Sequence, residues 1–248
     1  MGAPVGPTGC NAPKKSDATS ASSADERIRG IQMAAGYGRF WSHLKFEDDS
    51  KPTLTEQSVV GQLGYFFTKD LSLTAVGGAI LSGTMKTDGP NLEVGTGFVV
   101  SMRVSWQFLD QKAFRPFLSA SMTASYSRAP FEDAADRKGT LWGTDVRFGL
   151  TAGYTFFGWW TVYLSPRVFG GPVFIDDGET KLQGRDRYFI QAGMGTAFLL
   201  PKGFTVYVDG SPAGEQAVSA GLAWFLPVGR RSPEQTAARR TESDAQPQ

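Results

Sequence analysis

Apolar side chains alternate with small or polar ones over unusually long stretches of this sequence. Between Glu93 and Phe108, every second position from Val94 onward is apolar at seven of eight places, and the intervening positions are small or polar with one exception. The same pattern recurs from Arg115 to Ser127 and from Leu141 to Phe156. Because successive side chains of a strand point to opposite faces, a period of two indicates β-strands. The chain is therefore predicted to be all-β.

The length of these runs suggests where the strands lie. Strands of soluble proteins usually have about five or six residues, whereas these alternations persist for 13 to 16 residues. A tilted strand that crosses a bilayer needs roughly 9–11 residues and can protrude beyond it. We predict about ten such strands, with eight or twelve as alternatives. The runs are Ile28–Trp41, Thr55–Phe67, Leu71–Ser82, Glu93–Phe108, Phe114–Arg128, Leu141–Phe157, Trp159–Phe174, Asp186–Leu200, Phe204–Asp209 and Glu215–Val228.

The connections between the runs alternate in length. Short ones, such as Thr68–Asp70 and Pro201–Gly203, alternate with longer polar ones, such as His43–Leu54 and Ala129–Thr140. Antiparallel strands with short turns on one side and long loops on the other match the plan of a transmembrane up-and-down β-barrel. An even strand number places both chain ends on the short-turn side.

Composition excludes several other classes of protein. No run of about 18 apolar residues occurs, so a membrane-spanning helix is not expected. The 25 basic and 24 acidic residues leave no basic excess for nucleic acid. A single His and a single Cys leave no ligand set for a His/Cys zinc site. We therefore expect no metal, no cofactor and no nucleic-acid partner.

Two polar tails flank the predicted barrel. Residues 1–27 and 229–248 lack apolar periodicity and are expected to be disordered, which leaves 28–228 as one barrel domain. Cys10 follows Gly9, as in a lipoprotein cleavage site, and is a candidate for lipidation. No hydrophobic run precedes it, so an unused thiol is the simpler interpretation.

Aromatic residues gather near the ends of the predicted strands. Two such bands are typical of the girdles that flank the apolar belt of a membrane barrel, whereas ordinary core aromatics would spread along the strands. This distribution favours a membrane barrel over a soluble one. The candidate girdle residues are Trp41, Tyr65, Trp106, Tyr126, Trp142, Trp159, Trp160, Tyr188 and Trp224.

On these features the chain resembles the small outer-membrane β-barrel proteins of Gram-negative bacteria. The resemblance covers about residues 28–228 and rests on architecture, without a diagnostic motif. It implies a bacterial outer-membrane location with both termini in the periplasm. It also implies membrane lipid, lipopolysaccharide and the barrel-assembly machinery as partners.

Polar residues in the other register are predicted to face the barrel interior. Charges there are either paired with one another or exposed to water. Eight-stranded barrels are filled by their own side chains, and much larger ones hold a channel, so ten strands leave both a pore and a plugged interior open. The lumen-lining candidates are Glu93, Arg103, Asp145, Arg147, Arg167, Gln62, Gln107 and Gln191.

We therefore predict a non-catalytic barrel, acting either as a small-solute channel or as a structural or surface-binding element. One alternative is a lipid-modifying acyl hydrolase or transferase that uses His43. Ser42 is adjacent to it, but neighbouring residues of a strand point to opposite faces. The other alternative is a soluble or lipid-tethered barrel that binds an apolar ligand.

Overall fold

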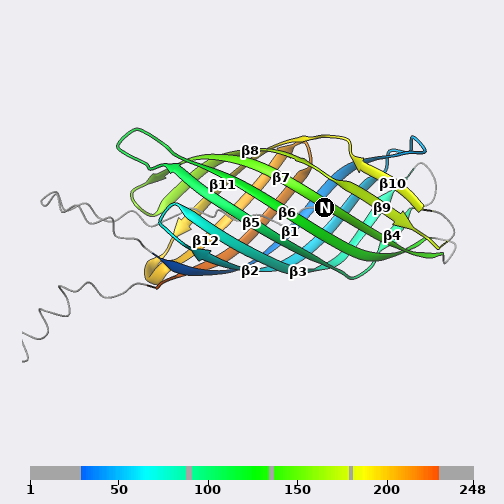
Figure 1. Ribbon diagram of the computed structural model, residues 1–248, viewed down its shortest axis with the longest axis horizontal. Helices are drawn as coiled ribbons and strands as arrows, with labels where there is room; N and C mark the ends of the chain where they lie inside the picture. The colour runs from blue at the N-terminus through cyan, green and yellow to red at the C-terminus, as the bar shows by residue number, and fades with distance from the viewer. Residues whose placement is uncertain (1–28, 88–90, 134–136, 179–180, 229–248) are drawn as a thin grey trace, which may run out of the picture.

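The computed structural model describes residues 29–87, 91–133, 137–178 and 181–228. They form an elongated, closed antiparallel β-barrel (Figure 1). Among these residues no helix is long and apolar enough to cross a membrane. The predicted tails, including Cys10, lie outside the described residues.

The described residues form thirteen strands and one short 3-10 helix, η1 (Pro201–Gly203). The strands are β1 (Gly30–Phe46), β2 (Thr53–Phe66), β3 (Leu71–Lys86), β4 (Leu92–Val94), β5 (Gly97–Leu109), β6 (Phe117–Asp133), β7 (Lys138–Phe156), β8 (Trp160–Gly170), β9 (Pro172–Asp176), β10 (Lys181–Asp186), β11 (Ile190–Leu199), β12 (Phe204–Ala213) and β13 (Gln216–Pro227).

These strands occupy ten positions in the wall. Three of these positions are each formed by two successive strands with a short interruption between them. These pairs are β4 with β5, β8 with β9, and β10 with β11. Each strand pairs antiparallel with its neighbours, and β13 pairs with β1 to close the ring. The predicted up-and-down barrel of about ten strands is confirmed.

The two ends of the barrel differ. We call the end that carries the connections 67–70, 110–116, 157–159 and 200–203 the turn end. The opposite end, where β1 ends at Phe46, β3 at Lys86, β6 at Asp133 and β9 at Asp176, is the loop end. The barrel begins at Gly30 and finishes at Pro227, which are paired at the turn end.

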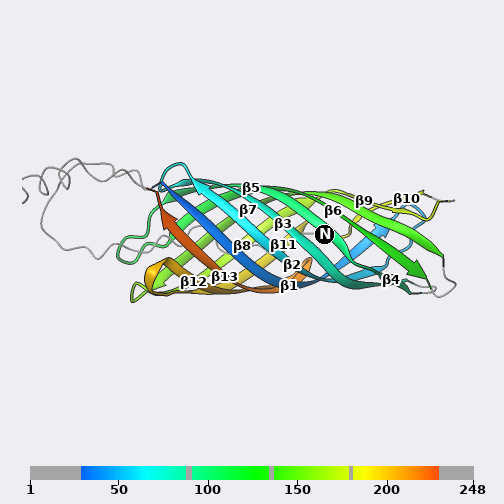
Figure 2. The same cartoon turned by 90° about the horizontal axis from the view of Figure 1, so that it is seen from below.

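The wall has fewer strands at the loop end than at the turn end. The β12–β13 hairpin turns at Gly214 and Glu215, opposite Trp41, before it reaches the loop end. Beyond it, β10 pairs directly with β1, with Leu44 opposite Asp186. There the ring consists of the eight strands β1, β2, β3, β4, β6, β7, β9 and β10. Figure 2 shows β12 and β13 confined to one half of the barrel.

Much of what the sequence suggested to be long polar loop is strand. β1 continues to Phe46 and β6 to Asp133, where loops were predicted from His43 and Ala129. The prediction was wrong because the polarity of the two faces reverses in this part of the wall. Toward the loop end, Leu44 and Phe46 point inward whereas Lys45 points outward.

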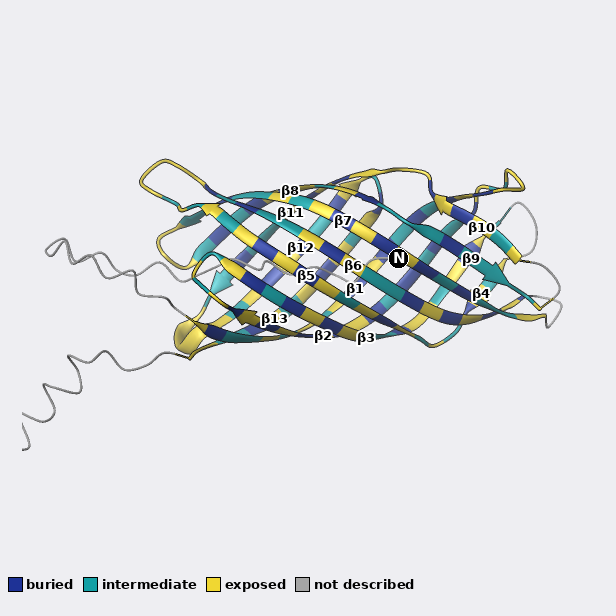
Figure 3. Ribbon diagram, in the orientation of Figure 1, coloured by how far each residue is buried: buried dark blue, intermediate teal, exposed yellow. Residues whose placement is uncertain are grey.

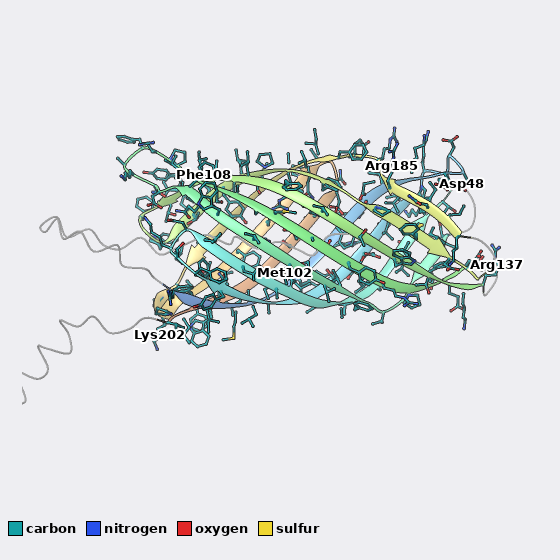
Figure 4. All side chains as sticks on the ribbon, viewed as in Figure 1. Asp48, Met102, Phe108, Arg137, Arg185 and Lys202 are labelled. Atoms are coloured by element: carbon teal, nitrogen blue, oxygen red, sulfur yellow. The ribbon has the colours of Figure 1, made fainter. Side chains whose placement is uncertain are left out.

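Between the two ends, the outer face is apolar. Leu63, Met102 and Leu164 are 56–59% exposed although they lie inside long strands. Figure 3 shows exposed and buried positions alternating along every long strand, and Figure 4 shows Met102 midway between Lys202 and Arg137. A continuous apolar surface of this kind is stable in lipid and unfavourable in water, so the barrel is transmembrane.

Aromatic residues border the apolar belt. Trp142 stacks on Phe174 near the loop end, with ring centroids 4.0 Å apart, and Trp224 stacks on Phe204 at the turn end. The structure places all nine predicted girdle residues on the outer face, with Trp41, Tyr126, Trp142 and Tyr188 toward the loop end and Tyr65, Trp106, Trp159, Trp160 and Trp224 toward the turn end.

Candidate functional site in the barrel interior

Apolar side chains fill the interior at the loop end. They come from seven strands around the ring, and Leu54 and Leu141 at their centre are completely buried. Most of them occupy the eight-stranded section, where the interior is only wide enough to be filled by side chains, and Phe40 lies just below it, opposite Ala217 of β13. We call this set the apolar plug. Its members are Phe40, Leu44, Phe46, Leu54, Ile80, Met85, Val94, Ala129, Phe131, Leu141 and Val173.

Next to the apolar plug, toward the turn end, the interior becomes charged. On β2, Glu56 follows Leu54 on the inward face, and on β7, Asp145 and Arg147 follow Leu141. We call this region the charged layer. It comprises Arg103, Arg147 and Arg167 together with the carboxyl groups of Glu56, Asp145, Asp186, Asp209 and Glu215.

Arg147 of the charged layer contacts two acids and an aromatic ring. Its guanidinium hydrogen-bonds to Asp145 on the same strand and lies 2.5 Å from Oε2 of Glu215, in the β12–β13 turn. The guanidinium also lies over the ring of Phe169, 4.8 Å from its centroid. Two carboxylates therefore neutralise one buried cation, as burial of a charge requires.

A second group of contacts surrounds Arg167 on β8. Its Nη2 lies 3.7 Å from Oδ2 of Asp209, and its Nη1 donates to Oε1 of Gln191 at 3.4 Å. Asp209 also accepts a hydrogen bond from the Tyr163 hydroxyl at 3.1 Å. The Nε2 of Gln191 donates to the backbone carbonyl of Glu215 at 2.7 Å, which links this group to the β12–β13 turn.

Glycines make room for the large side chains in this layer. A Cβ at Gly195 would lie 2.3 Å from the hydroxyl oxygen of Tyr163, and one at Gly36 would lie 2.8 Å from that of Tyr207. Both distances are too short for real contacts. These inward glycines therefore leave the space that the two tyrosine side chains occupy.

Glu56 differs from the other acids of the layer. It is fully buried between the apolar plug and the rest of the charged layer, and neither carboxyl oxygen has a hydrogen-bond partner among the described residues. Asp186, by contrast, accepts a hydrogen bond from the Ser42 hydroxyl.

Seven of the eight lumen-lining candidates lie on the inward face. Arg103, Asp145, Arg147, Gln62 and Gln191 are buried there, whereas Arg167 and Gln107 are partly exposed to the interior. Gln107 lies near the turn end, where its Nε2 donates to Asp110.

The prediction for Glu93 was wrong. Gly95 and Thr96 interrupt the strand, so the inward side chains are Val94 and then Gly97, three residues later. Glu93 therefore points outward and is exposed, opposite Glu132 of β6. The prediction assumed that inward and outward side chains alternate without a break from Glu93 to Phe108. The irregularity at Gly95 and Thr96 adds one residue and so reverses the direction of the side chains before it.

Sequence analysis missed four acids of the charged layer. Glu56 shares the inward register of Gln62, so the alternation on β2 could have identified it. Asp209 is the last residue of one predicted strand, and Asp186 and Glu215 are the first residues of two others. The alternation of inward and outward side chains was not extended to these three positions. The contacts of Glu215 with Arg147 and of Asp209 with Arg167 join strands that are not neighbours in sequence, so they depend on the closure of the barrel.

Ser42 and His43 do not form a catalytic pair. The Ser42 side chain is fully buried inside the barrel, whereas the His43 ring lies on the outer face, where its Nδ1 is 3.1 Å from the Thr53 hydroxyl. The edge of Tyr188 packs against the ring. The wall of the barrel separates the two residues.

Comparisons with known proteins show similarity of fold only. No protein-family model matches the chain, and no curated protein matches its sequence. Among solved structures, the translocator domain of the autotransporter NalP from Neisseria meningitidis is 11% identical, covering 82% of this chain and 88% of that one with a TM-score of 0.46. The outer-membrane protease OmpT from Escherichia coli is 12% identical, covering 85% and 100% with a TM-score of 0.43. An outer-membrane channel from Pseudomonas putida F1 is 10% identical, covering 84% and 100% with a TM-score of 0.38. The assignment of this chain as a transmembrane β-barrel rests on its own closed ring of strands and apolar outer face.

Proposed function

We propose that this protein is a closed, non-catalytic outer-membrane barrel that acts as a structural or surface-binding element. The observation that carries the proposal is the apolar plug. A channel for small solutes would need a continuous wet path, and a close-packed apolar section across the lumen excludes water and raises the barrier to ions. In the charged layer beneath it, Arg147 is paired with Asp145 and Glu215, and Arg167 with Asp209, which favours a plugged interior over a lined pore.

The topology supports an orientation with both chain ends in the periplasm. Gly30 and Pro227 are paired at the turn end, and barrels of the outer-membrane type carry their short turns on the periplasmic side. The loop end then faces the exterior of the cell. Insertion in this orientation would require the barrel-assembly machinery as a transient partner.

Conductance measurements test the closure directly. Folded protein, verified by a heat-dependent shift in gel mobility, would be reconstituted into a planar bilayer. We expect no steady openings at either polarity. Steady, reproducible openings would overturn the proposal and establish the small-solute channel instead.

Cysteine labelling tests whether the apolar plug is dry. In a Cys10→Ser background, Met85→Cys places a thiol in the apolar plug, whereas Thr84→Cys places one on the exposed face of the same strand. A charged thiol reagent should label the Thr84 variant rapidly and the Met85 variant at least a hundredfold more slowly. Comparable labelling of the two variants would show that water reaches the plug.

A further inference from the structure

Basic side chains face each other on the outer surface where β10 replaces β13 beside β1. Lys45 of β1 lies directly opposite Arg185 of β10. One step toward the turn end, the backbone amide of Arg187 donates to the carbonyl of His43, which places these two residues opposite each other as well. Like charges directly opposite on neighbouring antiparallel strands are destabilising. The facing side chains of Lys45 and Arg185 therefore repel each other.

Acidic groups of the protein compensate this charge only in part. Lys45 lies 3.0 Å from Asp49, whose side chain is 84% exposed. Arg185 and Arg187 have no ion pair among the described residues, and their guanidinium groups lie over the rings of Phe189 and Tyr188. Other basic residues of the loop end do have acidic partners, as in the pairs Arg137–Asp133, Lys138–Glu132 and Lys181–Asp176.

The surface beside this basic cluster is hollowed, and the surface below it is apolar. A cavity of about 540 Å³ is lined by Lys45, Arg185 and Phe189, and the acids Glu47 and Asp49 also belong to its lining. Toward the turn end it is followed by the outward side chains of Ile190, Val168 and Met194, which are 50–66% exposed. Figure 4 shows Arg185 projecting from the outer surface close to the loop end. Cations above an exposed apolar wall match an amphipathic anion.

We propose that Lys45, Arg185 and Arg187 bind the phosphate groups of lipopolysaccharide, with its acyl chains lying along Ile190, Val168 and Met194. This inference rests on the outer-membrane orientation proposed above, in which the loop end lies in the outer leaflet. A phosphate would replace the repulsion between facing cations by charge-assisted hydrogen bonds, for which arginine is well suited. Phe189 and Tyr188 lie at the level where aromatic rings meet lipid headgroups.

The test compares two triple variants of the folded, full-length protein in detergent. Lys45→Gln/Arg185→Gln/Arg187→Gln removes the site. Lys86→Gln/Lys138→Gln/Lys181→Gln removes the same charge from exposed positions elsewhere at the loop end. Binding of purified lipopolysaccharide would be titrated for each. We expect at least a tenfold loss of affinity in the first variant and less than a twofold change in the second. Equal affinities for the two variants would overturn the proposal.

Two further probes separate the sources of the phosphate. Dephosphorylated lipopolysaccharide and phosphatidylglycerol should each bind the wild type at least tenfold more weakly than lipopolysaccharide does. Equal binding of phosphatidylglycerol would show a general site for anionic lipid and overturn the assignment to lipopolysaccharide. Equal binding of the dephosphorylated form would overturn the role of phosphate.

Stability without lipid provides a readout that a purely structural role would not give. Removing the facing cations should leave the denaturation midpoint unchanged or raise it, and added lipopolysaccharide should raise the midpoint of the wild type only. A lower midpoint for the site variant without lipid would show that the cations are structural. Lipid binding and conductance are measured independently, so the two proposals can fail separately. A conducting barrel that binds lipopolysaccharide would contradict only the proposed closure. A closed barrel that does not bind it would contradict only the proposed lipid site.

Discussion

The guanidinium of Arg147 and the carboxylate of Glu215 meet inside the barrel, with Nη1 and Oε2 2.5 Å apart. Arg147 lies on β7, whereas Glu215 occupies the turn between β12 and β13, three positions further around the ring. The pair thus holds the tip of the short hairpin toward the opposite wall. It does so at the level where the ring changes from ten strands to eight.

Removing this cation should be costly. Arg147→Met leaves Asp145 and Glu215 buried without their common partner, and we expect a loss of about 3–5 kcal/mol in the free energy of unfolding. Arg128→Met, on the exposed face of β6, should change it by less than about 0.5 kcal/mol. The combination Arg147→Met/Asp145→Asn/Glu215→Gln should recover part of the loss, because no ionised group then remains unpaired. Urea unfolding in detergent measures all three, and equal stability of the two single variants would contradict the role of Arg147.

A methyl group added at Gly195 should be poorly tolerated. Its Cβ would overlap the ring of Tyr163 and approach the carbonyl of Val208, so Gly195→Ala should cost about 1–3 kcal/mol. At Gly77, on the outer face, a Cβ would meet nothing within 4 Å. Gly77→Ala should therefore be neutral or stabilising, by up to about 1 kcal/mol. If both substitutions have the same effect on the urea midpoint, the close packing around Tyr163 is wrong.

A charge in the apolar belt should destabilise the barrel according to its depth. Met102→Arg, in the middle of β5, should cost about 2–4 kcal/mol in vesicles, whereas Thr84→Arg near the loop end should cost about 0–1 kcal/mol. Equilibrium unfolding from lipid vesicles would measure both values. Equal costs at the two positions would be incompatible with the proposed position of the bilayer.

One ion pair at the turn end should make stability depend on pH. The hydrogen bond from the Lys69 ammonium, 2.9 Å away, lowers the pKa of the Asp110 carboxyl. A lowered pKa means that the ionised form stabilises the folded state above the unfolded pKa of about 3.9, and that this contribution is lost as the pH falls through the folded value.

Asp110→Asn should accordingly reduce stability at pH 7 by less than about 1 kcal/mol, because both side chains are partly exposed and screened. The difference from the wild type should vanish when the pH falls below the folded pKa of Asp110. A difference in unfolding free energy that persists unchanged at pH 2.5 would show that the carboxylate charge is not responsible.

The sequence by itself determined the strands, their faces and their approximate number. Alternation along β5 and β7 identified Arg103, Asp145 and Arg147 as inward because side-chain direction in a strand depends only on local geometry. The same reasoning separated Ser42 from His43. It failed at Glu93, where one additional residue shifts the register, and in the loop-end extensions, where inward residues are apolar and outward residues polar.

Only the tertiary structure decided which residues meet. The contact of Glu215 with Arg147, the packing of Leu54 and Leu141 inside the barrel, and the facing cations Lys45 and Arg185 all depend on where β12 and β13 end. A short hairpin lets β10 pair with β1, and the ring narrows to eight strands. No local pattern encodes that event, because it follows from the register between strands that are more than 100 residues apart.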